Sequence, residues 1–195
     1  GSVVLHPDVQ WMYFGLLNFS ATTPGQTITS NTVYIQSEMF FDGIGGEWIF
    51  QDTLQTDIIN LKNGSINTNS QRLTSKSFTS YNLNSRSLTL GSTVWSLTSP
   101  AHDAWYTSSS NFTFDAGTSL LRMEKSGYIN NTGQNLNFYN AIAADSLQNF
   151  LLFNGNFNKL IIIGNGGLSG VNTYDSLLLN AGKTYTLSSS IHTIL

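Results

Sequence analysis

The sequence contains no cysteine, which excludes disulfide bonds, zinc–thiolate sites and cysteine nucleophiles. Charge is scarce as well, because 8 Lys and Arg with 11 Asp and Glu make up only 10% of the 195 residues, against about 25% in a typical protein. The formal net charge is −3, and no basic stripe is present that could neutralise phosphates. We therefore expect no nucleic-acid partner.

Long apolar runs are also missing. No stretch approaches the ~18 apolar residues that a membrane-spanning helix needs. The first residues show neither the basic end nor the apolar block of a signal peptide. The sequence therefore predicts no membrane span.

Small polar residues are abundant instead. Ser, Thr and Asn account for 67 of the 195 residues, while hydrophobic residues still reach 40% and aromatic residues 12%. This apolar content is too high for a disordered chain. Low charge with many hydroxyl and amide side chains favours a location at the cell surface.

The apolar stretches are short, alternate with a period of two, and end at Gly or Asn, which is the pattern of β-strands. Five such stretches restart at a glycine (Gly64, Gly91, Gly117, Gly155 and Gly182), and the steps are nearly equal except for a longer one after Gly117. A near-constant step predicts a solenoid, with glycine supplying the positive φ of each corner. We predict an all-β fold, a right-handed parallel β-helix with coils of about 27 residues. An antiparallel β-sandwich or jelly roll is the alternative.

In this fold, equivalent strands should begin at the same place in successive coils. We expect residues 59–61, 88–90, 112–114 and 177–179 to be such equivalents, with one shared core. Gly1 and Ser2 are typical of a cloning scar, and residues 3–26 are an N-terminal segment or cap of unknown role. Residues 27–195 are the predicted solenoid domain, which we expect to be cut from a longer protein and truncated at its C-terminal edge.

The run GGLSGVNTYDSLLLNAGKTYTLSSSIHTI, from Gly166 to Ile194, resembles a repeat of very large secreted surface proteins of Bacteroidetes. Residues 40–52, 87–97 and 104–121 resemble the upstream part of the same proteins. The resemblance implies a repeat-containing, type IX-secreted adhesin or fibre at the cell surface. Its partners would be neighbouring solenoid coils of the parent protein and a glycan or cell-surface ligand.

Catalytic and metal-binding patterns are weak. The acidic residues are scattered, and the only close pairs in the middle of the chain, Asp42 with Glu47 and Asp52 with Asp57, are better explained as caps and turns. We therefore predict no enzyme activity, no metal site and no cofactor. The alternative is a carbohydrate-active β-helix enzyme, a polysaccharide lyase or hydrolase.

Two kinds of site residue remain. Trp105 and Tyr106 lie between Pro100 and a Ser-rich run, a loop-like setting that predicts an exposed aromatic contact with a ligand. Three Asp-Ser/Thr-apolar triplets resemble the O-glycosylation sequon of Bacteroidetes, and the sugar would be carried by Thr53, Ser146 and Ser176. The predicted function is a non-enzymatic segment of a secreted adhesin that extends and presents a surface for attachment to glycans, cells or substrata.

Overall fold

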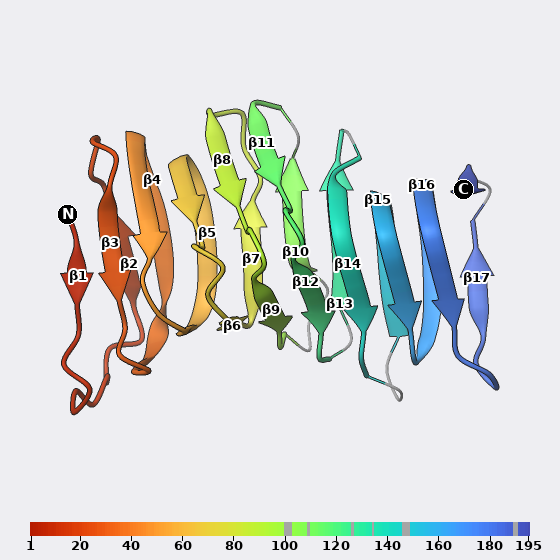
Figure 1. The fold of residues 1–195 in the computed structure, drawn as a ribbon, viewed down its shortest axis with the longest axis horizontal. Helices are drawn as coiled ribbons and strands as arrows, with labels where there is room; N and C mark the ends of the chain where they lie inside the picture. Colours follow the sequence, from red (N-terminus) through yellow and green to blue (C-terminus); the bar gives the residue numbers. More distant parts are fainter. Residues whose placement is uncertain (100–102, 109, 126, 134, 146–148, 189–190) are drawn as a thin grey trace.

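The computed structural model describes residues 1–99, 103–108, 110–125, 127–133, 135–145, 149–188 and 191–195. Within these residues the chain forms strands and no helix, so none of them belongs to a helix that could cross a membrane. The strands pair in parallel and stack along one axis in chain order, from β1 at one end to β17 at the other (Figure 1). The fold is a β-solenoid of about 8 turns, which confirms the predicted fold class.

From β4 onward, each turn contributes one strand to each of three parallel sheets, which we name faces 1, 2 and 3. Face 1 contains β2 (Leu16–Phe19), residues 38–41 of β4 (Tyr34–Phe50), residues 58–61 of β5 (Leu54–Asn67), β7 (Ser77–Ser80), β10 (Asp103–Ser108), β13 (Gly127–Thr132), residues 149–153 of β15 (Asn149–Ile162), residues 165–169 of β16 (Asn165–Leu179) and β17 (Tyr185–Leu187).

Face 2 contains β1 (Val3–Val4), β3 (Gln26–Thr29), residues 47–50 of β4, residues 64–67 of β5, β8 (Arg86–Thr89), β11 (Phe112–Asp115), residues 137–138 of β14 (Asn137–Ala143), residues 156–157 of β15, residues 172–174 of β16 and β18 (His192–Ile194). Face 3 contains residues 34–35 of β4, residues 54–56 of β5, β6 (Leu73–Ser75), β9 (Val94–Leu97), β12 (Leu120–Met123), residues 140–143 of β14, residues 159–162 of β15 and residues 176–179 of β16.

The core runs along the axis between the three faces. Because side chains alternate across a strand, every second residue of each strand points inward and stacks on its register partner in the next coil. On face 1 this inward row has nine members: Leu17, Met39, Ile59, Phe78, Trp105, Ile129, Leu152, Leu168 and Leu187. The seven central members are at most 1% exposed, whereas Leu187 in the last coil is 59% exposed.

The coil length differs from the prediction. The coils are about 20 residues apart along most of the chain, as between the register partners Ile59 and Phe78. Longer coils, close to the predicted length, are found where β7, β8 and β9 pair with β10, β11 and β12. The shortest step on face 1 lies between β15 and β16, where Leu152 pairs with Leu168.

The spacing between the five restart glycines does not equal the coil length, because these glycines occupy different corners of the coil. Gly91 and Gly117 both follow a face 2 strand, but Gly64 begins one and Gly182 follows a face 3 strand. Four of them have the expected positive φ, while at the fifth corner Asn154, with a φ of 60°, takes this role instead of Gly155. Glycine therefore marked corners correctly but did not mark one fixed point of the coil.

The four segments predicted to be equivalent strands are consequently divided among the faces. Residues 59–61 lie on face 1, residues 88–90 and 112–114 begin in β8 and β11 of face 2, and residues 177–179 lie on face 3. They do share one core, although Leu179 at the last coil is 37% exposed.

The solenoid also extends further toward the N-terminus than the predicted boundary at residue 27. Within residues 3–26, β1 pairs with β3 and β2 pairs with β4, so this segment supplies strands to the stack. Leu5 and Trp11 pack partly buried against the core between these strands. The N-terminal segment thus covers part of the first coil's interior.

Candidate binding surface on face 1

Trp105 points into the core, so the exposed position expected for it is wrong. Its side chain is 0% exposed and lies in the inward row of face 1 between Phe78 and Ile129. The indole Nε1 donates a hydrogen bond to Asn131 Oδ1 at 3.1 Å. Sequence polarity suggested a loop here, but β10 pairs with β7 on one side and β13 on the other, and these ladders determine which side Trp105 faces.

Tyr106, the next residue, lies in the outward row of face 1. Its ring stacks on Tyr81 with the centroids 4.4 Å apart and the planes 12° from parallel. Tyr81 is 52% exposed, and Leu83 beside it is 73% exposed. The register partners of Tyr106 are uncharged residues, Thr79 on β7 and Asn130 on β13. We name Tyr81, Leu83 and Tyr106 the tyrosine patch.

Arg86 links two corners of neighbouring coils next to the tyrosine patch. Its side chain is 2% exposed, and the guanidinium donates hydrogen bonds to carbonyl oxygens of Asn84 at 2.8 Å, Ser108 at 3.1 Å and Ser110 at 2.6 Å, and to that of Ser80. Burial lowers the pKa of this guanidinium below its usual value. The bonds tie the corner after β7, which contains Tyr81, to the corner after β10, the strand that carries Tyr106.

A groove of about 560 Å³ opens further along face 1, over β15, β16 and β17. Gly166 and Gly167 are among the residues that line it. Gly167 belongs to the outward row that runs from Tyr128 through Leu151 to Thr186, and it is the one member of these four without a side chain. A volume of this size lies in the range of small-molecule sites.

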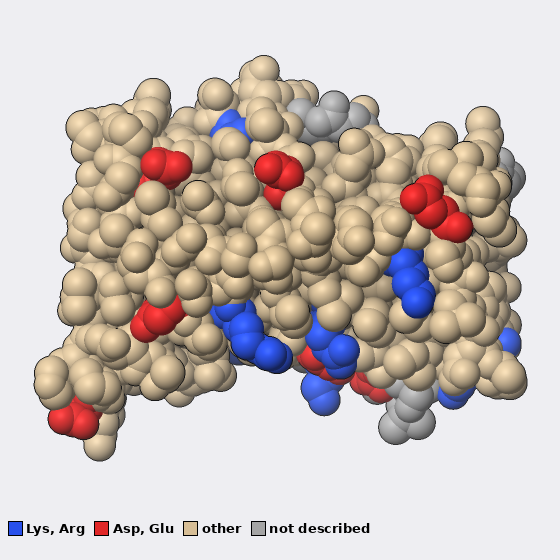
Figure 2. All heavy atoms as spheres, viewed as in Figure 1, with Lys and Arg blue, Asp and Glu red and all other residues tan. Residues whose placement is uncertain are grey.

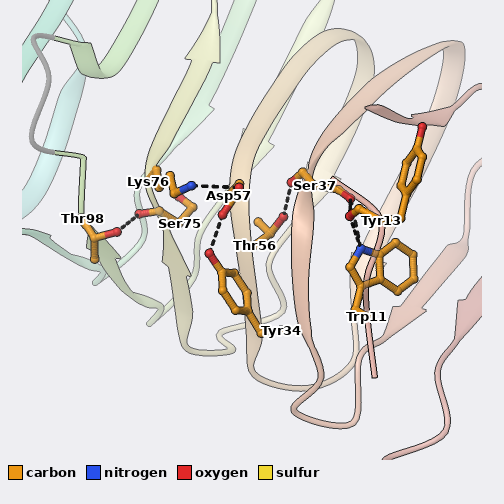
Figure 3. A network of polar contacts seen from close by, with 9 residues as sticks. All are labelled: Trp11, Tyr13, Tyr34, Ser37, Thr56, Asp57, Ser75, Lys76 and Thr98. Atoms are coloured by element: carbon orange, nitrogen blue, oxygen red, sulfur yellow. Dashed lines mark hydrogen bonds and ion pairs between the residues drawn. The ribbon is translucent and has the colours of Figure 1, made fainter. Parts of the chain in front are cut away.

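The acidic residues of the middle coils bond to neighbouring coils. Asp57 Oδ2 lies 2.9 Å from Lys76 Nζ, and its Oδ1 accepts a hydrogen bond from the Tyr34 hydroxyl (Figure 3). Asp42 contacts Lys62 at 3.3 Å and Asn63. These lysines are far from the acids in sequence, so sequence reasoning missed them.

The corner between faces 3 and 1, where Asp57 lies, also carries a series of hydroxyl groups that hydrogen-bond from coil to coil. Thr56 Oγ1 donates to the Ser37 carbonyl at 2.9 Å, and Thr98 Oγ1 donates to the Ser75 carbonyl at 3.2 Å (Figure 3). Trp11 Nε1 donates to Ser37 Oγ at 3.0 Å, which attaches the N-terminal segment to this series. Small polar residues therefore satisfy the backbone at the bend between faces 3 and 1.

Charges are sparse on the surface. On the side shown in Figure 2, Lys and Arg and Asp and Glu appear as a few scattered spots among other residues. In the part of the chain that the structure describes, no group of three or more His, Asp and Glu residues is placed to hold a metal ion.

The three sequon positions have different settings. Thr53 is exposed in the turn between β4 and β5, and the adjacent Asp52 accepts hydrogen bonds from the backbone N–H groups of Ser30 and Asn31, the first at 2.9 Å. Ser176 is exposed on β16. Ser146 lies outside the described residues.

Sequence reasoning missed Tyr81, Arg86 and the groove. Tyr81 and Tyr106 meet because they follow or lie on adjacent face 1 strands whose register is set by the pairing of β7 with β10. The one available signal was the Gly166–Gly167 pair near the start of β16, because glycine within a strand is typical of a close backbone approach.

Comparison with protein-family models, with curated proteins and with solved structures gives no significant match to this chain.

Proposed function

We propose that the chain is a non-enzymatic segment of a large secreted bacterial surface adhesin or fibre, and that face 1 is its attachment surface. The observation that carries the proposal is the tyrosine patch, which places a stacked, partly exposed aromatic pair beside uncharged Thr79 and Asn130. Exposed tyrosines provide large, rigid contact area with a polar end, and they are enriched in binding surfaces. Such a surface suits the apolar faces and hydroxyl edges of glycans.

The architecture supports a role in extension and presentation. Parallel ladders run along all three sides of the stack, so each coil is hydrogen-bonded to its neighbours along the axis. In repeat folds of this kind stability comes from contacts between neighbouring coils, and additional coils lengthen the rod. In this proposal the neighbouring partners are further coils of the parent protein.

Attachment can be tested on a glycan array and on glycan-coated surfaces. Tyr81→Ala and Tyr106→Ala should each reduce binding about tenfold or more, with little change in the melting temperature. Tyr139→Ala is the matched control, because Tyr139 is 37% exposed on β14, which lies outside face 1. Full binding by folded Tyr81→Ala and Tyr106→Ala proteins would contradict the proposal.

The competing function is a carbohydrate-active enzyme. Asp42 and Asp57 are bonded to lysines, and Asp52 accepts bonds from the backbone, which supports structural roles for these acids. The test is a polysaccharide screen for newly formed reducing ends or unsaturated products. Turnover that disappears on Asp52→Asn substitution would establish the enzyme instead.

We also propose Thr53, Ser146 and Ser176 as O-glycan acceptors when the protein is made in a Bacteroidetes host. The exposure of Thr53 and Ser176 supports access by a glycosyltransferase. Intact-mass measurement and peptide mapping should show sugar at these positions and its loss in Thr53→Ala and Ser176→Ala. Unmodified protein from such a host would refute this part.

A further inference from the structure

We infer that the groove over Gly167 is a second binding site, and that it takes one or two rings of a neutral pyranose chain. The ligand class rests on the proposed attachment to glycans, but the site itself is separate from the tyrosine patch. Gly167 lies three strands further along face 1 than Tyr106, because β13 and the first part of β15 come between β10 and β16.

Gly167 has no side chain, and the end of the Leu151 side chain lies over its backbone at one side of the groove. Tyr128 and Leu151 precede Gly167 in the outward row and form one wall, and Thr186 follows it. Leu151 covers this glycine, since a Cβ atom built on Gly167 would lie only 2.4 Å from Leu151 Cδ2. The wall on this side is therefore apolar and aromatic.

The opposite wall is lined with hydroxyl groups. Thr184, Thr186 and Ser188 come from β17 and its flanking residues in the last coil. The backbone N–H of Thr184 is already hydrogen-bonded to Asn165 Oδ1 at 3.0 Å, which fixes the position of this wall relative to β16. Thr184 and Thr186 are exposed, so their side-chain hydroxyls are accessible to a ligand.

The lining selects the chemical class of the ligand. Among the described residues no Asp, Glu, Lys, Arg or His lines the groove, which leaves an aromatic and aliphatic wall facing a hydroxyl wall. A pyranose ring has the complementary pattern, with an apolar face of C–H groups and a hydroxyl edge. An acidic sugar would lack a cationic partner among these lining residues, so discrimination against it is expected.

The test is titration calorimetry with neutral hexasaccharides (cellohexaose, laminarihexaose and mannohexaose) and with the acidic hexagalacturonate. Gly167→Thr displaces the Leu151 side chain and so changes the apolar wall of the groove, at a strand position whose φ is not positive and where threonine is favoured. Leu151 can rotate away, because the closest atom is the end of a flexible side chain. We expect at least one neutral hexasaccharide to bind and Gly167→Thr to weaken its binding tenfold or more.

A second variant tests the groove without displacing Leu151. Thr186→Val keeps the shape of the wall and removes one hydroxyl, and it should weaken binding about threefold to tenfold. Thr173→Val is the matched control, since Thr173 lies on the same strand, β16, but on face 2. It should leave binding unchanged.

The outcomes distinguish this site from the proposed function. Binding that is lost in Gly167→Thr and kept in Tyr106→Ala establishes the groove as a site of its own. Binding that is lost in Tyr106→Ala and unaffected by Gly167→Thr and Thr186→Val overturns the groove while it supports the tyrosine patch. Absence of any neutral hexasaccharide binding, or tighter binding of hexagalacturonate, also overturns the inference.

Discussion

Phe78 and Trp105 occupy the same position on consecutive coils, with ring centroids 4.6 Å apart. Trp105 also contacts the rings of Trp95 at 5.7 Å, Phe114 at 5.5 Å and Phe138 at 5.4 Å. These residues come from all three faces, so the indole joins the faces across the interior. The longest coils of the solenoid close around this aromatic cluster.

Trp105→Ala should therefore be strongly destabilising. Replacing a buried tryptophan by alanine removes its buried area and leaves a cavity, which typically costs about 3–5 kcal/mol. Denaturant titration should show this loss of unfolding free energy, while Tyr106→Ala, which truncates the outward neighbour, should change it by less than about 1 kcal/mol. Equal effects of the two substitutions would show that Trp105 is not a core residue.

Arg86 should be required for stability although its hydrogen bonds go to carbonyl oxygens and not to a carboxylate. Its guanidinium satisfies carbonyl oxygens of four residues from two coils, and Arg86→Met leaves these acceptors without their donor. We expect a loss of about 2–4 kcal/mol in unfolding free energy, since buried hydrogen bonds to charged groups contribute strongly. Arg72→Met is the control, because Arg72 is exposed. Similar melting temperatures for both variants would argue against this role.

The fold class could be predicted from the sequence because period-two alternation, scarce charge and glycine corners are local signals. The coil length could not, since Gly64, Gly91 and Gly182 occupy different corners and only strand pairing shows which residues are equivalent. The same limit explains the error at Trp105. Polar runs precede and follow its segment in the sequence, but the side that its strand buries is determined by β7 and β13.

The candidate sites show this limit more clearly. Tyr106 stands out within its own segment, whereas its partner Tyr81 follows β7 in the preceding coil and meets it only through the pairing of β7 with β10. The groove depends on Tyr128, Gly167 and Thr186, which three successive pairings bring into one row. Surface sites on a solenoid with variable coils are therefore tertiary features, and their residues can be combined only once the register is known.

Tyr34 should make stability depend on alkaline pH. Burial, the hydrogen bond to Asp57 and the charge of Asp57 raise the pKa of Tyr34 to about 12, from about 10 in the unfolded chain. The folded state favours the protonated form of Tyr34. The stabilisation that this side chain contributes is therefore complete below about pH 10 and is lost as the pH rises to about 12. The difference in unfolding free energy between wild type and Tyr34→Phe should be constant from pH 7 to 9 and decline between pH 10 and 12. A difference that stays constant up to pH 12 would contradict the assignment.

The last coil should promote self-association. Within the described residues, β17 and β18 pair only with β16, so their other edges present unpaired backbone groups. Leu187 and Ile194 beside these edges are 59% and 68% exposed. Unpaired strand edges with apolar side chains favour pairing with another chain.

We expect sedimentation velocity to show concentration-dependent association of the wild type and a shift toward monomer in Leu187→Lys, because a charge in the inward row opposes stacking. Leu83→Lys replaces another exposed leucine, at the corner after β7, and should not alter association. A wild type that is monomeric at all concentrations, or equal shifts in both variants, would exclude this edge as the contact.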